Sequence, residues 1–272
     1  MAAQNMNIHP TAIVEQGAQV GQDVTIGPFT VIERDVVIGD GCLIGPHVFI
    51  LRHTSLGEGC RVHAGAVLGG LPQDLNFSGE DSYVRIGKNC VIREHVTIHR
   101  GAKAGTVTEV GDGCFLMVNV HLAHNVRLGD RVIMANNTLL GGYVEVGERA
   151  FISGNVVVHQ NCKIGRIAMV GGSGGFSKDI PPFCTTHPHA LNELLGLNVI
   201  GMRRAGLKPE ERLVVKRSFD LMFRSGLNFS QAIAKIRQEY PTGLGAEFAD
   251  FVDKSGRGIC RLSVNAEDES EV

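Results

Sequence analysis

The sequence predicts a parallel β-helix of hexapeptide repeats followed by a smaller α-helical region. Every sixth residue from Ile8 to Val170 is a large aliphatic residue, except at Asp74, Glu80 and Ala104. The residue after this position is often glycine, so each unit reads aliphatic-Gly-x-x-x-x. With 35 glycines, 6% aromatic residues and no tryptophan, the composition favours a turn-dense β architecture over a layered α/β core.

Each hexapeptide supplies one short strand and one tight turn, and three units close a triangular coil of about 18 residues. Residues one coil apart then stack at the inter-strand spacing of about 4.8 Å, with the aliphatic ladder inside the prism. Five of the seven cysteines lie four residues after a ladder position, where small apolar residues fill the prism. They are Cys42, Cys60, Cys90, Cys114 and Cys162. An odd number of cysteines without a C-x-x-C pair disfavours both disulfides and a zinc ribbon.

Two insertions interrupt the repeat and preserve its phase. They cover about residues 69–85 and 101–109. Because loops that project from a rigid scaffold commonly carry binding groups, we expect both insertions to contribute to a functional site.

The repeat ends after Gly171, and Pro181 and Pro182 follow. Apolar residues then recur at helical spacing, and we expect the first long helix to open at Pro209 and to end by Gly226. The sequence therefore predicts a β-helix over residues 1–185, a helical domain over 186–265 and a disordered acidic tail over 266–272.

Length and composition limit the classes of function. A chain of 272 residues that is 43% hydrophobic can bury a substantial core without staples. A formal net charge of −2 gives no overall reason to expect a nucleic-acid partner. Residues 1–7 do not resemble a signal peptide, and no segment approaches the roughly 18 apolar residues of a membrane span. We expect a cytoplasmic protein.

The sharpest local signal is a stack of three residues spaced one coil apart: His124, Gly142 and Gln160. On the outer surface of the prism, a histidine beside an exposed glycine amide could act as a general base next to an oxyanion donor. The alternative is a solvated surface histidine, but His99, His121 and His159 cluster with it. Zinc is a rival for such a cluster. His121 and His124 should point differently, so the spacing disfavours a metal site.

A second patch is basic. Residues 201–224 hold seven cations against the three acids Glu210, Glu211 and Asp220. It is either a solvated helix face or a docking site for an acidic carrier or a pyrophosphate. The cations are Arg203, Arg204, Lys208, Arg212, Lys216, Arg217 and Arg224.

Several motifs resemble the UDP-N-acetylglucosamine O-acyltransferase family over nearly the whole chain. They are IHPTAIVE (8–15), QDL (73–75), IRE (92–94), VTIHRG (96–101), ANN (135–137), VHQ (158–160), VGG (170–172), PP (181–182), RSG (224–226) and RG (257–258). The resemblance implies that the β-helix is left-handed and that the chain forms a homotrimer with active sites between subunits. It also implies transfer of an (R)-3-hydroxyacyl group from acyl carrier protein to the glucosamine 3-position of UDP-N-acetylglucosamine, the first step of lipid A biosynthesis. The acyl thioester is then a co-substrate, with no cofactor and no metal.

The resemblance also implies residue roles. His124 matches the catalytic base, and Gly142 matches the backbone amide that stabilises the thioester oxyanion. Nucleotide-sugar contacts are matched by Asp74, His121, Gln160, Asn198 and Arg204. Gly172, together with Met169, matches the position that limits acyl length. We also assign to the substrate site Gln73, His99, Tyr143, His159 and Arg203.

Four positions depart from the family pattern: Asn76 replaces Lys, Asn125 replaces Asp, Tyr143 replaces His and Ile200 replaces Glu. An asparagine can accept a hydrogen bond from an imidazole but cannot stabilise an imidazolium as a carboxylate does. One alternative is therefore an N-acyltransferase that acts on a 3-amino UDP-sugar, because an amine needs less help from a base. The other is a low-activity paralogue that binds nucleotide sugar.

Overall fold

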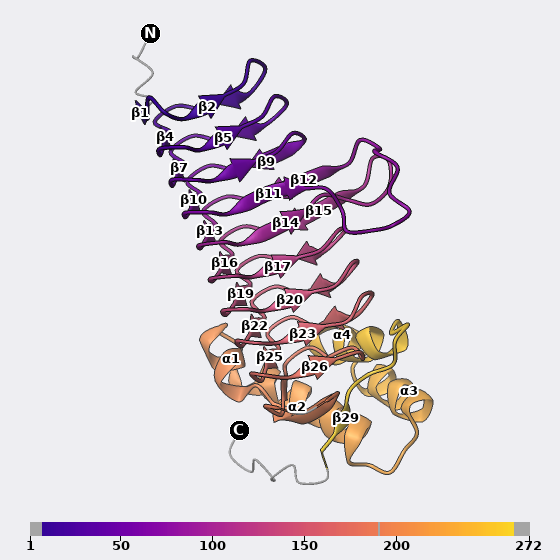
Figure 1. Cartoon of the computed structure of the whole chain (residues 1–272). Helices are drawn as coiled ribbons and strands as arrows, with labels where there is room; N and C mark the ends of the chain where they lie inside the picture. The colour runs from indigo at the N-terminus through magenta and orange to yellow at the C-terminus, as the bar shows by residue number, and fades with distance from the viewer. Residues whose placement is uncertain (1–6, 190, 264–272) are drawn as a thin grey trace.

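The computed structural model describes residues 7–189 and 191–263, which form a parallel β-helix followed by helices (Figure 1). Each coil gives one strand to each of three sheets. Residues one coil apart pair in register, as Val31 does with Phe49 and Ile32 with Ile50. The stacking expected from the six-residue period is confirmed.

Three sheets, A, B and C, make the walls of the prism, and the described residues give them 12, nine and eight strands. Sheet A contains β1 (Asn7–Ile8), β4 (Thr25–Ile26), β7 (Leu43–Ile44), β10 (Arg61–Val62), β13 (Val91–Ile92), β16 (Phe115–Leu116), β19 (Ile133–Met134), β22 (Phe151–Ile152), β25 (Met169–Val170), β27 (Cys184–Thr186), β28 (Glu193–Leu197) and β29 (Arg261–Leu262). Sheet B contains β2 (Ile13–Val14), β5 (Val31–Ile32), β8 (Phe49–Ile50), β11 (Val67–Gly70), β14 (Thr97–His99), β17 (His121–Leu122), β20 (Leu139–Leu140), β23 (Val157–Val158) and β26 (Gly175–Phe176). Sheet C contains β3 (Gln19–Val20), β6 (Val37–Ile38), β9 (Thr54–Leu56), β12 (Tyr83–Ile86), β15 (Val107–Val110), β18 (Arg127–Leu128), β21 (Glu145–Val146) and β24 (Lys163–Ile164).

The corners of the prism depend on one left-handed backbone position in most turns. This position lies three residues after the ladder residue, and Asn125 and Tyr143 both occupy it with φ of 61°. Asparagine and glycine adopt this conformation at low cost, whereas a bulky residue such as Tyr143 is strained there. The backbone therefore sets the direction of the side chains at each corner.

The interior is closely packed. The five cysteines expected to fill the prism are at most 1% exposed, and their packing role is confirmed. A hydrogen bond with Cys114 and burial raise the pKa of Cys90 to about 12, so this thiol stays neutral. All seven cysteines are free.

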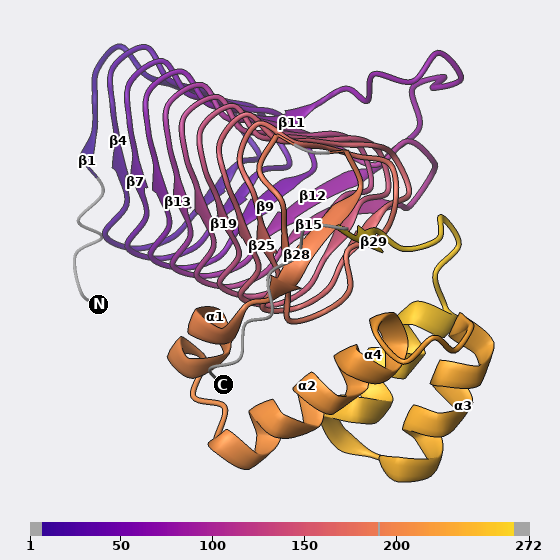
Figure 2. The ribbon, with the colours of Figure 1, turned by 90° about the horizontal axis from the view of Figure 1, so that it is seen from below.

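Both insertions leave the prism intact but are shorter than expected. Gly69 and Gly70 extend β11, so the first loop covers residues 71–82, and the second covers 100–106. The phase survives because Ile86 pairs with Leu56 and Val110 pairs with Ile86. The longer loop projects from one corner of the prism (Figure 2).

After a hairpin of β27 and β28, four helices follow: α1 (Val199–Arg204), α2 (Pro209–Phe223), α3 (Phe229–Glu239) and α4 (Gly243–Asp253). As expected, Pro209 is the first residue of α2, where its missing N–H costs nothing. The Glu211 carboxylate accepts from the backbone N–H of Lys208 at 2.7 Å and satisfies another free donor. The boundary at residues 185 and 186 stays a prediction, and the tail over 266–272 lies outside the described residues.

The helical region is joined to the β-helix at Arg166. Its guanidinium donates two hydrogen bonds to the Glu247 carboxylate of α4, at 2.5 and 2.9 Å, and lies 4.7 Å from the centre of the Phe183 ring. Such a bidentate pair constrains orientation as well as distance. It therefore helps to place the helices against the β-helix.

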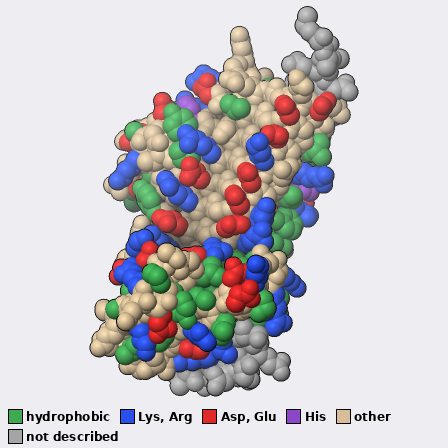
Figure 3. Space-filling model, turned by 180° about the vertical axis from the view of Figure 1, so that it is seen from behind, with side chains coloured by type: hydrophobic (Ala, Val, Ile, Leu, Met, Phe, Trp, Pro, Cys, Tyr) green, Lys and Arg blue, Asp and Glu red, His purple; other side chains and the backbone are tan. Residues whose placement is uncertain are grey.

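Charged side chains form a ladder on sheet C. Glu109 pairs with Arg85 at 3.8 Å and with Arg127 at 3.7 Å, and Lys163 pairs with Glu145 at 3.5 Å. Interspersed acidic and basic side chains are also visible on the face in Figure 3, opposite that of Figure 1. Sheets A and B instead expose apolar side chains, including Leu43, Phe49 and Val157. Within the described ranges, no helix is both long and apolar enough to cross a membrane.

Candidate active site

His124, Gly142 and Gln160 lie at the same corner of consecutive coils, after β17, β20 and β23. The Tyr143 N–H donates to the carbonyl of His124 at 3.0 Å, and the Asn161 N–H donates to the carbonyl of Gly142 at 2.9 Å. The predicted stack is confirmed. It places the imidazole of His124 directly beside the backbone of Gly142.

The contact between His124 and Gly142 is so close that a side chain at residue 142 would require the imidazole or the backbone to shift. A Cβ atom on residue 142 would lie 2.5 Å from His124 Cε1. The Tyr143 ring packs edge-on against the imidazole, with centroids 5.2 Å apart. Consequently His124 is only 9% exposed and Gly142 is buried. Both residues lie outside the aliphatic interior, as expected, but the expectation that they are exposed was wrong.

Asn125 determines which imidazole nitrogen carries the hydrogen. Asn125 Oδ1 accepts from the backbone N–H of Ala102 at 2.9 Å, and His124 Nδ1 lies 3.1 Å from the same oxygen. Because a backbone N–H can only donate, this atom is the amide oxygen, and Nδ1 must donate to it. In the neutral ring, Nε2 is then the nitrogen with the free lone pair, as a general base requires.

Residues that the sequence interpretation missed hold this arrangement. The Asn125 N–H donates to the buried Thr108 Oγ1 at 2.8 Å, and Ala102 belongs to the loop over residues 100–106. The only sequence signal for these residues was the insertion over about residues 101–109, which was expected to contribute to a functional site. Neither residue type suggests a role in catalysis.

The Gly142 N–H donates no hydrogen bond to any of the described residues. At this corner in earlier coils, the equivalent N–H groups of Arg34 and Arg52 donate to carboxylates of Glu15 and Glu33, which lie 19 residues earlier. For Gly142 that position is Ala123, whose methyl group cannot accept. An unpaired amide beside a general base is a candidate oxyanion donor.

His99 and His121 lie in neighbouring coils, with ring centroids 4.9 Å apart. Burial, with the neighbouring His121 and His124, lowers the pKa of His99 to about 4. Burial also lowers the pKa of His121, whose Nδ1 lies 2.7 Å from Thr97 Oγ1. Both rings are thus neutral near pH 7. Across the part of the chain that is described, no group of three or more His, Cys, Asp or Glu residues could hold a metal ion.

The loop over residues 71–82 carries Gln73, which is exposed, and Asp74, which is partly exposed. Asp74 Oδ1 accepts from the Asn76 N–H at 2.9 Å and from the Asn76 side-chain amide at 3.2 Å. These hydrogen bonds, with the nearby charges of His124 and Lys103, lower the pKa of the Asp74 carboxyl. Asp74 is therefore an ionised carboxylate near pH 7, held within its own turn.

His159 lies at the same corner as Gln160, and both are exposed. His159 Nδ1 lies 3.1 Å from both Arg257 Nη2 and the Gln160 carbonyl oxygen. A guanidinium can only donate, so Nδ1 accepts from Arg257 and cannot also donate to the carbonyl. The sequence motif at 257–258 contained Arg257, but sequence spacing could not place it here.

The other assigned residues lie elsewhere in the chain. Asn198 and Arg204 line a cavity of about 640 Å³ between the sheet A strands and α1, with Met169 and Ile200. Arg203 is exposed on α1 beside it. Figure 2 shows α1 against a different side of the prism from the projecting loop. A single chain thus does not bring these residues to His124.

Two residues of this second group have structural surroundings that sequence spacing did not predict. Asn198 caps α1, since its Oδ1 accepts from the Gly201 N–H at 2.9 Å and its Nδ2 donates to the Ile167 carbonyl at 2.7 Å. Gly172 lies at the corner between sheets A and B. A Cβ there would make ordinary contacts with the Gly154 carbonyl oxygen at 3.4 Å and Ser153 Cβ at 3.6 Å.

Comparison with known proteins assigns the family. Residues 179–260 match the family model "Udp N-acetylglucosamine O-acyltransferase; Domain 2", and segments 17–52, 35–70 and 108–142 match the bacterial transferase hexapeptide model. An acyl-[acyl-carrier-protein]--UDP-N-acetylglucosamine O-acyltransferase of an Anaeromyxobacter species is 44% identical over 94% of this chain and 100% of its own. The chain belongs to the UDP-N-acetylglucosamine O-acyltransferase family.

Solved structures of the family agree. LpxA, a UDP-N-acetylglucosamine acyltransferase from Bacteroides fragilis, is 40% identical with a TM-score of 0.88, covering 93% of this chain and 99% of its own. The Francisella novicida enzyme is 33% identical with a TM-score of 0.89, covering 95% of each chain. The fold class is that of the family, a left-handed parallel β-helix with a helical C-terminal region.

Proposed function

We propose that this protein transfers an (R)-3-hydroxyacyl group from acyl carrier protein to the 3-hydroxyl of UDP-N-acetylglucosamine, in the first step of lipid A biosynthesis. We place this reaction in the cytoplasm. The observation that carries the proposal is that the imidazole of His124 lies beside the Gly142 N–H, which donates to no described residue. The relatives of this chain are named for this reaction.

The geometry suggests a mechanism. Nε2 of His124 takes the proton of the sugar hydroxyl as its oxygen attacks the thioester carbonyl. The Gly142 N–H donates to the oxyanion of the tetrahedral intermediate. Collapse of that intermediate forms the ester and breaks the carbon–sulfur bond, and the imidazolium returns the proton to the leaving thiolate. The residues Gln73, Asp74, His99, His121, Tyr143, His159 and Gln160 would surround the sugar and the thioester.

We further propose a homotrimer in which the cavity beside α1 of one chain faces the histidine corner of another. Sheets A and B expose apolar side chains, whereas sheet C carries a ladder of ion pairs. Exposed apolar surface on two walls and charge on the third favour association through sheets A and B. Asn198, Arg203 and Arg204 would then bind the nucleotide, while Met169 and Gly172 would limit the acyl chain.

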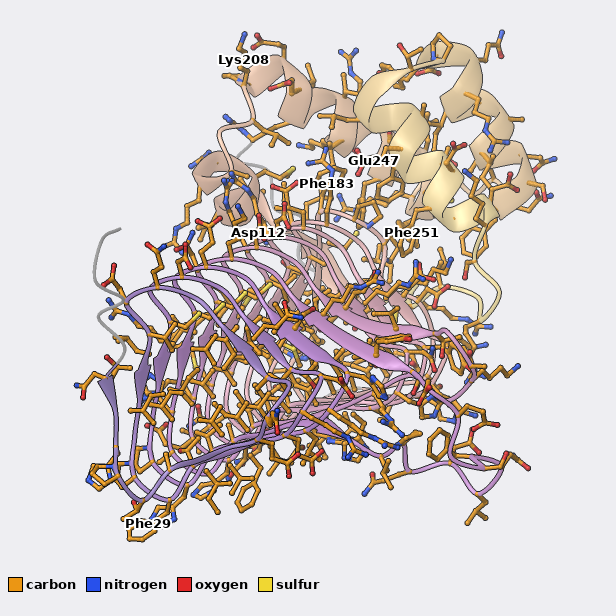
Figure 4. The ribbon with its side chains drawn as sticks, turned by 90° about the horizontal axis from the view of Figure 1, so that it is seen from above. Phe29, Asp112, Phe183, Lys208, Glu247 and Phe251 are labelled. Atoms are coloured by element: carbon orange, nitrogen blue, oxygen red, sulfur yellow. The ribbon has the colours of Figure 1, made fainter. Side chains whose placement is uncertain are left out.

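We assign the remaining cations of the basic patch, those at and along α2, to docking of acyl carrier protein. Lys208 at the start of α2 is among its exposed cations (Figure 4). Attraction to an acidic carrier through such a patch would accelerate association and would weaken with salt.

Turnover of the purified protein tests this function. Incubation with (R)-3-hydroxyacyl carrier protein and UDP-N-acetylglucosamine should give the acylated nucleotide sugar by mass spectrometry. Absence of this product with every 3-hydroxyacyl chain length would reject the proposed reaction.

The amide at Asn125 favours a second candidate, an N-acyltransferase that acts on a 3-amino UDP-sugar. Because Asn125 carries no charge, it would stabilise the His124 imidazolium less than a carboxylate would. An amine nucleophile loses its proton more easily once it has attacked, so it depends less on the base.

Asn125→Asp distinguishes the acceptors. If the natural acceptor is the hydroxyl sugar, we expect wild-type protein to turn it over faster than its 3-amino analogue. If it is the amine, the wild type should prefer the analogue, and Asn125→Asp should raise kcat for the hydroxyl sugar by roughly tenfold. Parallel assays with both acceptors decide, with Asn89→Asp as an exposed control at another corner. If Asn125→Asp leaves the ratio of turnover for the hydroxyl sugar to turnover for the 3-amino analogue unchanged, Asn125 does not determine which acceptor is used.

A further inference from the structure

The loop over residues 100–106 presents one exposed cation beside the catalytic corner, Lys103. Its neighbour Ala102 donates its N–H to Asn125 Oδ1, the same atom that orients His124. The backbone of the residue before Lys103 is therefore connected to His124 through the Asn125 side chain. No motif in the sequence singled out this lysine.

Hydrogen bonds constrain the backbone on both sides of Lys103. Its N–H donates to Thr106 Oγ1 at 3.1 Å, and the Thr106 hydroxyl and N–H donate to the Lys103 carbonyl at 2.7 and 3.0 Å. The Gly105 N–H donates to the carbonyl of Asp81 in the other loop, at 2.8 Å. The two insertion loops are thus joined, and the start of the lysine side chain is held in place.

The loop over residues 71–82 packs on a buried arginine. Arg100 is 1% exposed, and its guanidinium lies 5.5 Å from the centre of the Phe77 ring. Phe77 in turn donates its N–H to the carbonyl of Asp74 at 3.0 Å. A buried cation under the ring helps to fix the turn that carries Asp74. The loop with Asp74 is therefore held against the loop with Lys103, which is in turn attached to Asn125 beside His124.

Asp74 and Lys103 are close without forming an ion pair. The positive charge of Lys103 contributes to lowering the pKa of the Asp74 carboxyl, after the hydrogen bonds from Asn76. Yet Lys103 makes no ion pair with any of the residues that the structure describes. Its exposed ammonium group therefore remains available to an anion that approaches the loop attached to Asn125 and His124.

We propose that Lys103 binds the pyrophosphate of the nucleotide sugar; this inference rests on the proposed function. A pyrophosphate near Asp74 would be repelled by the carboxylate, and attraction to the Lys103 ammonium would offset this repulsion.

The chemistry of the two substrates favours this anion over the phosphate of the carrier. The pyrophosphate is attached to the same sugar ring that reacts at His124. The phosphate of phosphopantetheine lies at the far end of a long arm from the thioester. A cation beside His124 is therefore closer to the pyrophosphate than to the phosphate of phosphopantetheine.

Lys103→Met tests the proposal, because methionine retains an unbranched apolar chain and removes the charge. We expect KM for UDP-N-acetylglucosamine to rise roughly tenfold, with kcat and KM for the acyl carrier protein within about twofold of wild type. Lys103→Arg should restore most of the affinity. Lys235→Met, on the exposed side of α3, is the matched control and should leave all three constants unchanged.

A rise in KM for the carrier alone, or an unchanged KM for the nucleotide sugar, would overturn the assignment. Calorimetric binding of UDP-N-acetylglucosamine to wild type and Lys103→Met needs no turnover. If the wild type shows no acyl transfer, the proposed function fails, while this affinity difference still tests Lys103.

Discussion

Replacing His124 with alanine is expected to lower kcat by roughly 10²- to 10⁴-fold. The reason is that Nδ1 of His124 donates to Asn125, so Nε2 is the nitrogen of the neutral ring that can accept a proton. The side chain lies at a corner rather than in the aliphatic ladder, so the fold should persist. Steady-state turnover under saturating substrates measures the effect, and thermal unfolding monitors the fold.

His9→Ala is a suitable control for this variant, because His9 lies far along the prism in the first described coil. It should retain wild-type turnover. If His124→Ala keeps more than about a tenth of the wild-type kcat, His124 is not the general base.

Replacing Gly142 with alanine should lower kcat by roughly 10²-fold or more. The new methyl group would lie 2.5 Å from His124 Cε1 and 2.6 Å from Nε2. The ring must therefore move away from its hydrogen bond with Asn125, or the backbone that carries the oxyanion donor must shift. Either displacement separates the base from the amide.

Gly256→Ala provides the matched control, since a Cβ there meets nothing within 4 Å. Turnover of the two variants should differ widely at similar thermal stability. Wild-type activity in Gly142→Ala would show that the close contact between residue 142 and the imidazole has no catalytic role.

The fold could be predicted because the prism repeats one physical constraint. Positions such as Ile32 and Ile50 face the same narrow interior, which admits aliphatic residues and excludes charge. The cysteine positions follow from the same period. The limits of the insertions were less accurate, because Gly70 and Tyr83 extend their strands beyond the aliphatic ladder.

The candidate site could be predicted only in part. His124 and Gly142 stack because both follow the period, so spacing alone placed them together. The second insertion leaves the six-residue period, so no spacing rule places its residues relative to His124. Ala102 and Lys103 lie in this insertion, and Thr108 lies directly after it. The burial of His124 also depends on contacts, especially the Tyr143 ring, that a sequence period does not describe.

The most direct test of the proposed site between subunits is complementation between two inactive chains. His124→Ala and Arg204→Ala should each lose most activity as homotrimers. Mixed trimers, co-expressed with different tags and purified through both, should regain activity, because some interfaces then pair an intact histidine corner with an intact α1. Mixed trimers as inactive as their parents would contradict a site built from His124 of one chain and Arg204 of another.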